Sequence, residues 1–287
     1  MDAESARDRM LAGLPVTGRV FDAAGVATTV WELGAGPPMV LLHGGIECGG
    51  AMWAPVARGL AAHHRIIVPD LPGLGQSAPV DRLVPATFAA WLLAVLDRMQ
   101  LRRPVLVAHS LAGSLAARFA GGHSDAIGRL VLYAAPGVGP YRMPIRFRYL
   151  AIRFTLRPTA DNAERFDRFA LHDLDATRRR DPGWFEAFDA YTRSRAAVLH
   201  VRRTMHRLVA DQTRPIDEAD LAGITVPTTL LWGRHDRMVP LAVGQHAARR
   251  HGWPLHVIEN AAHAPHVEQP QAFVDELERI VGALHQR

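Results

Sequence analysis

The sequence contains no lysine, a single cysteine and no long hydrophobic run. All 33 basic residues are therefore arginine, which we attribute to a GC-rich genome rather than to function. Because Cys48 has no partner in the chain, an internal disulfide is excluded. The longest apolar run, residues 88–96, has nine residues, whereas a membrane-spanning helix needs roughly 20. Residues 1–13 lack the apolar core of a signal peptide, so we expect a cytoplasmic protein without a membrane span.

The charge of the chain is unevenly distributed. The formal net charge is +5. Residues 137–214 contain 16 arginines against nine acidic residues, a balance of +7, which leaves −2 for the remainder. Nucleic-acid binding calls for a dense basic stripe with a recognisable reading motif, and the sequence has no such motif. We therefore expect a small-molecule substrate and no nucleic-acid partner.

Short apolar segments alternate with longer helical patterns along the 287 residues, which is typical of βαβ units and a largely parallel sheet. Helical spacing of apolar residues predicts helices over 87–99, 111–121, 241–251 and 271–284. The predicted strands cover residues 26–33, 39–43, 65–69, 105–109, 130–134, 228–232 and 255–259.

One long interval, residues 137–226, interrupts this alternation. Its arginine and aromatic content has helical spacing and differs from the strand-rich flanks. We predict a core formed by residues 1–136 and 227–287, with residues 137–226 inserted as a helical cap.

Residues 105–113 read VLVAHSLAG, an apolar strand followed by a turn of small residues and a helix, with Ser110 at the turn. This segment resembles the nucleophile elbow of the α/β-hydrolase superfamily, in which the serine adopts a positive φ. The usual pattern Gly-x-Ser-x-Gly has alanine at both glycine positions here, Ala108 and Ala112, and glycine only at Gly113. By itself the segment also fits a serine that caps the helix.

Two further segments match the superfamily. Residues 230–240 read LLWGRHDRMVP, and the resemblance implies that Asp236 is the catalytic acid. Residues 257–263 read VIENAAH and place the catalytic histidine at His263, with His266 in a structural role. Taken alone, Asp236 could instead cap the helix that begins near residue 241. Ser110, Asp236 and His263 nevertheless follow three different predicted strands in the expected chain order.

A glycine-containing loop, residues 40–46 with the sequence VLLHGGI, resembles the His-Gly-x loop of the same superfamily. The resemblance implies an oxyanion hole formed by the backbone amides of Gly45 and Leu111, with Ile46 as an alternative to Gly45. His43 is expected to hold this loop. Cys48 is expected to be an unreactive, small apolar residue.

The sequence predicts neither a cofactor nor a metal site. Residues 70–77, DLPGLGQS, contain two glycines but lack the third glycine at dinucleotide-binding spacing, so we interpret them as a structural turn. His263 and His266 lack the i, i+4 spacing and the glutamate of a zinc protease site.

The resemblance covers residues 20–285 and implies an α/β-hydrolase fold, a mostly parallel eight-stranded sheet flanked by helices with an inserted cap. It implies a serine hydrolase that cleaves a small or medium carboxylic ester through an acyl-enzyme. Two alternatives remain: a carbon–carbon bond (diketone) hydrolase with the same triad, and a catalytically weak binding protein. The cap arginines either face the pocket mouth or lie on solvated helix faces, and four of them are Arg142, Arg146, Arg148 and Arg153.

Overall fold

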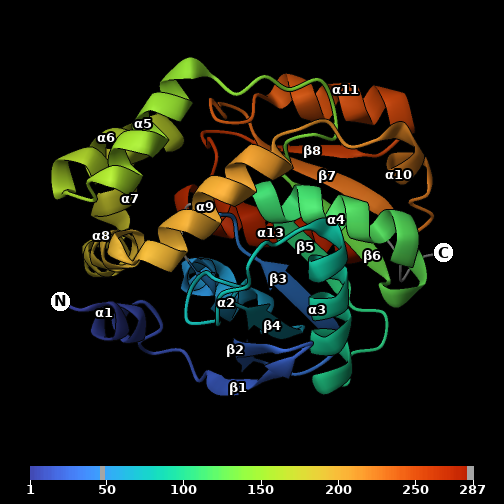
Figure 1. The fold of residues 1–287 in the computed structure, drawn as a ribbon, viewed down its shortest axis with the longest axis horizontal. Helices are drawn as coiled ribbons and strands as arrows, with labels where there is room; N and C mark the ends of the chain where they lie inside the picture. Colours follow the sequence, from blue (N-terminus) through green and yellow to red (C-terminus); the bar gives the residue numbers. More distant parts are fainter. Residues whose placement is uncertain (46–48, 283–287) are drawn as a thin grey trace.

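The computed structural model describes residues 1–45 and 49–282, and its centre is one eight-stranded sheet with the order β1-β2-β4-β3-β5-β6-β7-β8 (Figure 1). Only β2 runs against the other described strands, because it pairs antiparallel with both β1 and β4. The predicted mostly parallel sheet is thus confirmed. The strands are β1 (Thr17–Ala23), β2 (Val26–Leu33), β3 (Pro38–Leu42), β4 (Arg65–Pro69), β5 (Val105–His109), β6 (Arg129–Tyr133), β7 (Thr228–Gly233) and β8 (Leu255–Ile258).

The central strands form the core of the protein. Leu106 of β5 lies opposite Val40 of β3 and Leu130 of β6, and all three side chains are fully buried. Parallel strands are covered on both faces, which explains why they read as continuous apolar runs. Because β3 and β5 to β8 all point the same way, the segments that follow them meet at one edge of the sheet.

Helices cover both faces of the sheet (Figure 1). On one face α4 (Ser110–His123) packs against α3 (Pro85–Arg98) and the short α10 (Glu218–Ala222). On the other face α2 (Ala54–Leu60) packs against α13 (Pro270–Gly282) and α12 (Pro265–Glu268). Further along, α11 (Leu241–His251) contacts β7 and β8.

The seven strands expected from the sequence are all present, with ends within one residue of the prediction. The prediction missed β1, whose side chains are mostly exposed because it is an edge strand paired only with β2. A two-residue turn joins these strands, and both of its residues, Ala24 and Gly25, have positive φ, as a tight β-hairpin requires. The predicted helix 271–284 is observed as α13, and its last two positions lie outside the described residues, as does Cys48.

Six helices lie between β6 and β7, and the first five of them are set to one side of the sheet (Figure 1). The side chains of Thr159, Asp173 and Asp181 cap three of them, α6, α7 and α8, by accepting a hydrogen bond from a backbone N–H group in the first turn. The N-terminal helix α1 (Ala3–Met10) also joins this group, because it packs on α8. The five helices are α5 (Ile145–Leu156), α6 (Ala160–Ala170), α7 (Leu174–Arg180), α8 (Pro182–Ala197) and α9 (Leu199–Gln212).

Among the described residues, no helix has both the length and the apolar character needed to cross a membrane.

Candidate active site

Ser110 stands at the junction of β5 and α4, at the sheet edge where the central strands end. Its φ is +54°, the left-handed conformation that the sequence predicted for this position. Ser110 is the first residue of α4, and its hydroxyl lies 3.0 Å from Nε2 of His263. The hydroxyl therefore points at the imidazole, and the alternative role as a helix cap is wrong.

Asp236 and His263 come from the segments after β7 and β8. Oδ1 of Asp236 accepts hydrogen bonds from the backbone N–H groups of Met238 and Val239, at 2.8 and 2.9 Å. Oδ2 of Asp236 lies 2.8 Å from Nδ1 of His263. Because α11 begins only at Leu241, Asp236 holds its own loop and does not cap that helix.

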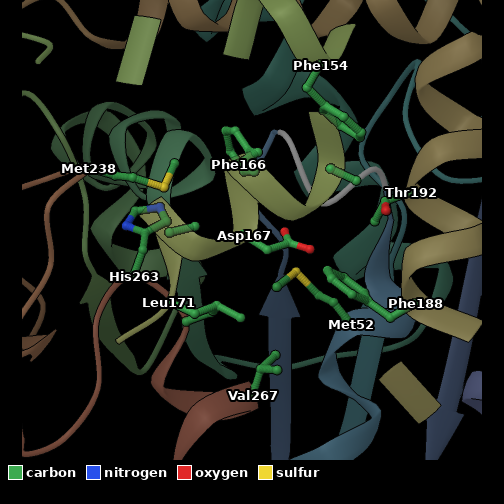
Figure 2. A pocket seen from close by; sticks show the side chains of 13 residues that line it. Met52, Phe154, Phe166, Asp167, Leu171, Phe188, Thr192, Met238, His263 and Val267 are labelled. Atoms are coloured by element: carbon green, nitrogen blue, oxygen red, sulfur yellow. The ribbon is translucent and has the colours of Figure 1, made fainter. Parts of the chain in front are cut away.

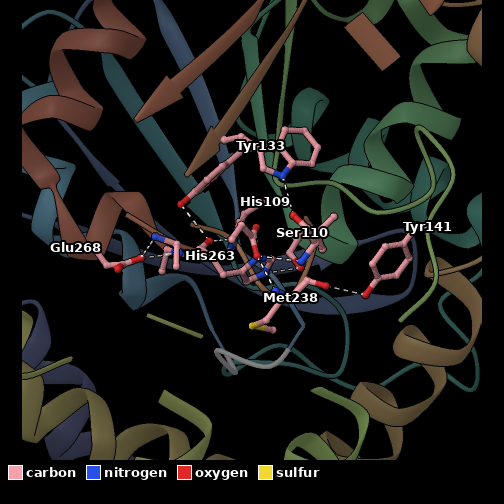
Figure 3. Close-up of polar contacts among 12 residues, drawn as sticks. His109, Ser110, Tyr133, Tyr141, Met238, His263 and Glu268 are labelled. Carbon is pink, nitrogen blue, oxygen red and sulfur yellow. Dashed lines mark hydrogen bonds and ion pairs between the residues drawn. The ribbon is translucent and has the colours of Figure 1, made fainter. Parts of the chain in front are cut away.

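The structure therefore brings together all three residues predicted from the sequence, and all three are buried (Figure 3). Asp236 accepts the Nδ1–H of His263, so Nε2 is the atom that accepts the hydroxyl proton of Ser110. A hydroxyl, an imidazole and a carboxylate joined in this order can move a proton away from the hydroxyl oxygen as it attacks a substrate.

Small residues are needed around Ser110, and the structure shows where. A Cβ atom on Gly113 would lie 2.6 Å from Cβ of Ala135 and 3.0 Å from the carbonyl oxygen of Ala108, so no side chain fits there. The methyl groups of Ala108 and Ala112 are fully buried, and Ser110 still meets His263. The departures from the Gly-x-Ser-x-Gly pattern therefore leave the serine in place.

The two residues predicted for the oxyanion hole, Gly45 and Leu111, line one cavity together with Ser110 and His263. The backbone N–H of Leu111 lies in the first turn of α4, where amides have no partner within the helix and the helix dipole favours negative charge. A Cβ atom on Gly45 would lie 2.6 Å from Cδ1 of Leu111, so the two residues are in close contact. The alternative donor Ile46 lies outside the described residues.

His43 and Asp70 hold the loops next to this cavity. Nδ1 of His43 donates to the carbonyl oxygen of Gly44 at 2.7 Å, and its Nε2 accepts the N–H of Leu71 at 3.0 Å. The carboxylate of Asp70 accepts the N–H groups of Gly50 and Gln76 at 2.7 and 2.8 Å. Both side chains are buried, and their hydrogen bonds are the structural ones that the sequence led us to expect.

Comparison with known proteins agrees with this geometry. The model of the alpha/beta hydrolase family matches residues 39–276. A 2-hydroxy-6-oxo-2,4-heptadienoate hydrolase from Pseudomonas putida is 30% identical over 273 residues, which cover 90% of this chain and 93% of the relative. The chain belongs to the alpha/beta hydrolase family.

Two further relatives differ in the activity that their names state. A pimeloyl-[acyl-carrier protein] methyl ester esterase from Aeromonas hydrophila is 26% identical, over 90% of this chain and 100% of its own length. The solved structure of a meta-cleavage product hydrolase from Pseudomonas fluorescens superimposes with a TM-score of 0.76 at 20% identity, over 93% of this chain and 98% of that one. This last likeness supports the fold alone.

The hydrolase has an apolar cavity beside His263, formed by α5, α6 and α8 of the insertion and by the core (Figure 2). Met238 and His263 line both this cavity and the smaller one that contains Ser110, so they lie between the two. Figure 2 shows the aromatic rings of Phe154, Phe166 and Phe188 around the apolar cavity. An uncharged, largely apolar substrate group fits such a lining.

Arginine is absent from the described residues that line these two cavities. The four arginines considered above, Arg142, Arg146, Arg148 and Arg153, are exposed. Arg148 lines a different cavity, which lies between α5 and α9. The structure therefore places these arginines away from the site that contains Ser110, with Arg142 in the segment before α5 and the other three on α5. Among the described residues, no group of three histidine, cysteine, aspartate or glutamate side chains is placed to hold a metal ion.

One acidic residue in the apolar cavity, Asp167 of α6, was missed from the sequence. Its carboxyl group extends into the cavity between Phe166 and Met52 (Figure 2), which accounts for its partial exposure. Burial among apolar groups raises the pKa of Asp167 to about 8; Asp189 and Glu164 also raise it, and Arg178 lowers it. At neutral pH this carboxyl group is therefore largely protonated and uncharged. The sequence shows only that Asp167 lies in a segment with helical spacing.

We expect Asp167→Asn to change stability in a pH-dependent way. The native pKa lies above the unfolded value, so between about pH 4 and 8 the folded protein holds a proton that the unfolded chain releases. The stability of the wild type then falls with rising pH by up to about 1.4 kcal/mol per pH unit, a dependence that asparagine lacks. Urea unfolding at several pH values should show the variant gaining relative stability as pH rises. Asp161→Asn, on the exposed face of the same helix, is the control; an equal gain in both variants would contradict the expectation.

Glu268 of α12 holds the loop that carries His263, and no feature of the sequence other than its position pointed to this role. One carboxylate oxygen accepts the N–H groups of Ala262 and Ala264 at 2.8 and 3.3 Å, and the other accepts the N–H of His172 at 2.5 Å (Figure 3). The N–H of His263 donates to the carbonyl oxygen of Ala170 at 3.0 Å. The segment after α6 is thus attached to the histidine loop at two points.

Replacement of Glu268 by alanine should lower the free energy of unfolding by about 2–4 kcal/mol, because buried N–H groups lose their acceptor. Burial raises the pKa of Glu268 to about 7, although its three backbone hydrogen bonds lower it. Glu268→Gln keeps a carbonyl oxygen of similar size, and we expect it to lose less than half as much. Denaturant unfolding of both variants would measure this; equal losses would contradict the expectation, because glutamine keeps the volume and one acceptor oxygen.

A cluster of buried rings supports the same loop from the sheet side. Nε2 of His109 lies 2.9 Å from the carbonyl oxygen of His263, and its ring stacks on Tyr133 with 4.4 Å between centroids. The hydroxyl of Tyr133 lies 2.9 Å from Nδ1 of His266. Burial lowers the pKa of His109 well below its ordinary value and that of His266 to about 3, with contributions from His263. His109 and His266 are therefore neutral, structural groups.

Proposed function

We propose that this alpha/beta hydrolase is a cytoplasmic serine hydrolase that cleaves a small or medium carboxylic ester through an acyl-enzyme. The observation that carries the proposal is the hydrogen-bonded chain from Ser110 through His263 to Asp236, with distances of 3.0 and 2.8 Å. In this proposal residues 137–226 form the cap that closes the apolar cavity over the substrate.

The reaction begins when Nε2 of His263 takes the hydroxyl proton of Ser110 and Oγ attacks the ester carbonyl carbon. Asp236 keeps its hydrogen bond to Nδ1–H and stabilises the imidazolium that forms. His263 then gives the proton to the leaving alcohol oxygen, which leaves the acyl group on Ser110. A water molecule, deprotonated by His263, attacks the acyl-enzyme and releases the carboxylic acid.

The negative charge of the tetrahedral intermediate develops on the former carbonyl oxygen. We assign its stabilisation to the backbone N–H groups of Leu111 and Gly45, which line the same cavity as Ser110. The N-terminal end of α4 adds a favourable dipole at this point.

The cavity lining favours an uncharged ester over a substrate that bears a carboxylate. Neither cavity at His263 has an arginine among its described residues. One observation supports the alternative, a carbon–carbon bond hydrolase for a diketone that bears a carboxylate. Arg195 lies one turn after the cavity-lining Thr192 on α8, and its Nε is buried without a hydrogen-bond partner. The relative from Pseudomonas putida is named for a substrate of this kind.

Turnover of p-nitrophenyl esters of graded acyl length, compared with that of a dienoate diketone, tests the proposal. We expect Ser110-dependent hydrolysis of the esters, and covalent labelling by a fluorophosphonate in the wild type but not in Ser110→Ala. Cleavage of the diketone alone, sensitive to Arg195→Gln, would favour the alternative. Neither labelling nor turnover would indicate a binding protein that has kept the triad but lost catalysis.

A further inference from the structure

Helix α5 carries an unusual concentration of exposed apolar side chains. Ile145, Tyr149, Ile152 and Leu156 are 78, 55, 46 and 58% exposed. They account for four of the eight large apolar side chains that are exposed in the described part of the chain. An isolated exposed apolar residue needs no explanation, but a contiguous group on one element indicates a contact surface.

These four residues form one stripe along the helix. At about 100° per residue, their spacing of four, three and four places them within an arc of about 60°. The buried residues of α5 lie on the opposite side, and two of them, Phe147 and Phe154, line the cavities at His263. One face of α5 therefore covers the candidate active site, and the other presents the stripe to solvent.

Arginines border the stripe on both sides. By the same helical geometry Arg148 lies on one side and Arg146 and Arg153 lie on the other, and Arg157 directly follows the last residue of α5. All four are exposed, and α5 contains no acidic residue. The guanidinium of Arg153 donates to the hydroxyl of Tyr149 at 2.9 Å and lies over its ring.

The arginines of α5 differ from those of the next helix in one respect. On α6, Arg165 pairs with Asp161 at 3.1 Å and Arg168 pairs with Glu164 at 2.8 Å. Within the described part of the chain, no carboxylate forms an ion pair with the three arginines of α5 or with Arg157. Their positive charge is thus left uncompensated beside the apolar stripe.

We propose that the outer face of α5 docks on an anionic membrane surface. An interfacial helix buries an apolar stripe at the level of the lipid headgroups while basic side chains at its edges meet the anionic phosphates. A second copy of the chain fits less well, because a two-fold symmetric contact through this stripe would bring the arginine borders of both copies together. Nucleic acid or an acidic protein would pair with the arginines but leave the aliphatic side chains uncovered. Docking would also place the lipid surface above the cavity that α5 covers.

The test is flotation of the purified protein with vesicles of phosphatidylcholine alone and of phosphatidylcholine containing phosphatidylglycerol. The wild type is expected to bind the anionic vesicles, and binding should weaken as salt screens the arginines. Arg146→Gln combined with Arg153→Gln should weaken binding about thirtyfold, because each arginine contributes about 1 kcal/mol and about 1.4 kcal/mol corresponds to a tenfold loss. Ile152→Glu should weaken it at least tenfold.

Matched controls lie elsewhere on the surface. Val20→Glu introduces a carboxylate at an exposed apolar residue on β1. Arg102→Gln combined with Arg249→Gln removes two positive charges, as the α5 double variant does, but from exposed positions outside the insertion. Both should bind like the wild type, and all variants should unfold at the wild-type temperature because the altered side chains are exposed. Three results would overturn the proposal: no binding to anionic vesicles at low salt, losses in the controls as large as in the α5 variants, or binding unaffected by Ile152→Glu. A dimer that Ile152→Glu dissociates, without vesicle binding, would instead assign the stripe to a contact between copies.

Discussion

Ser110→Ala is expected to reduce ester hydrolysis by about 10⁴-fold or more while the protein remains folded. The hydroxyl group is the proposed nucleophile, and its removal leaves only transition-state binding by the surrounding groups. The loss of one oxygen at a cavity wall costs little stability, since the neighbouring alanines are packed by the helix and the sheet. Steady-state kinetics, with circular dichroism as a check on folding, would measure the effect.

Ser114→Ala is the matched control, because Ser114 lies one turn further along α4 and its hydroxyl bonds to the carbonyl oxygen of Pro136 instead of His263. We expect this control to keep most of its activity. The double variant Ser110→Ala with His263→Ala should be little worse than Ser110→Ala alone, since the two groups act as one unit. Retention of most activity by Ser110→Ala would refute the acyl-enzyme mechanism.

Asp236→Asn is expected to lower kcat by about 10³–10⁴-fold, and the structure gives a specific reason. The N–H groups of Met238 and Val239 hold Oδ1, so the amide oxygen of asparagine would take that place. Its NH₂ group would then face Nδ1 of His263, and the imidazole would have to move its proton to Nε2. In that tautomer His263 cannot accept the proton of Ser110.

A pre-steady-state measurement of acylation by a p-nitrophenyl ester would show this effect directly. Asp161→Asn makes the same chemical change on an exposed helix face, and we expect it to acylate at the wild-type rate. If Asp236→Asn acylated within a few fold of the wild type, another group would have to orient His263, and the assigned role of Asp236 would be wrong.

The central strands of the sheet were predictable because a strand that is buried on both faces consists of consecutive apolar residues. Residues 65–69 and 105–109 are apolar except for Arg65 at the start of one and His109 at the end of the other, and both form strands with the predicted ends. The edge strand β1 was not predictable in the same way, since its residues face solvent and its partner β2 supplies most of the order. The turn at Ala24 and Gly25 was its only local signal.

Ser110, Asp236 and His263 could be located from the sequence because each lies within a few residues of the end of a predicted strand. In a parallel sheet the ends of such strands meet at one edge, so local sequence is enough to place these residues near one another. Their hydrogen bonds could not be derived in that way. The orientation of His263 depends on Glu268, His109 and Ala170, which come from three other parts of the chain.

The sequence by itself determined the central strands of the sheet, the order of the three polar residues along it and the position of the inserted helices, because burial and turn geometry act over a few neighbouring residues. Only the tertiary structure decided which residues of the insertion meet the site. Helical spacing shows that one face of a helix is buried but not what it is buried against. The sequence therefore did not distinguish Asp167, which lies in the apolar cavity, from the arginines on the outer face of α5. Packing of α5, α6 and α8 over His263 separated them, since it placed the carboxyl group inside and left the guanidinium groups in water.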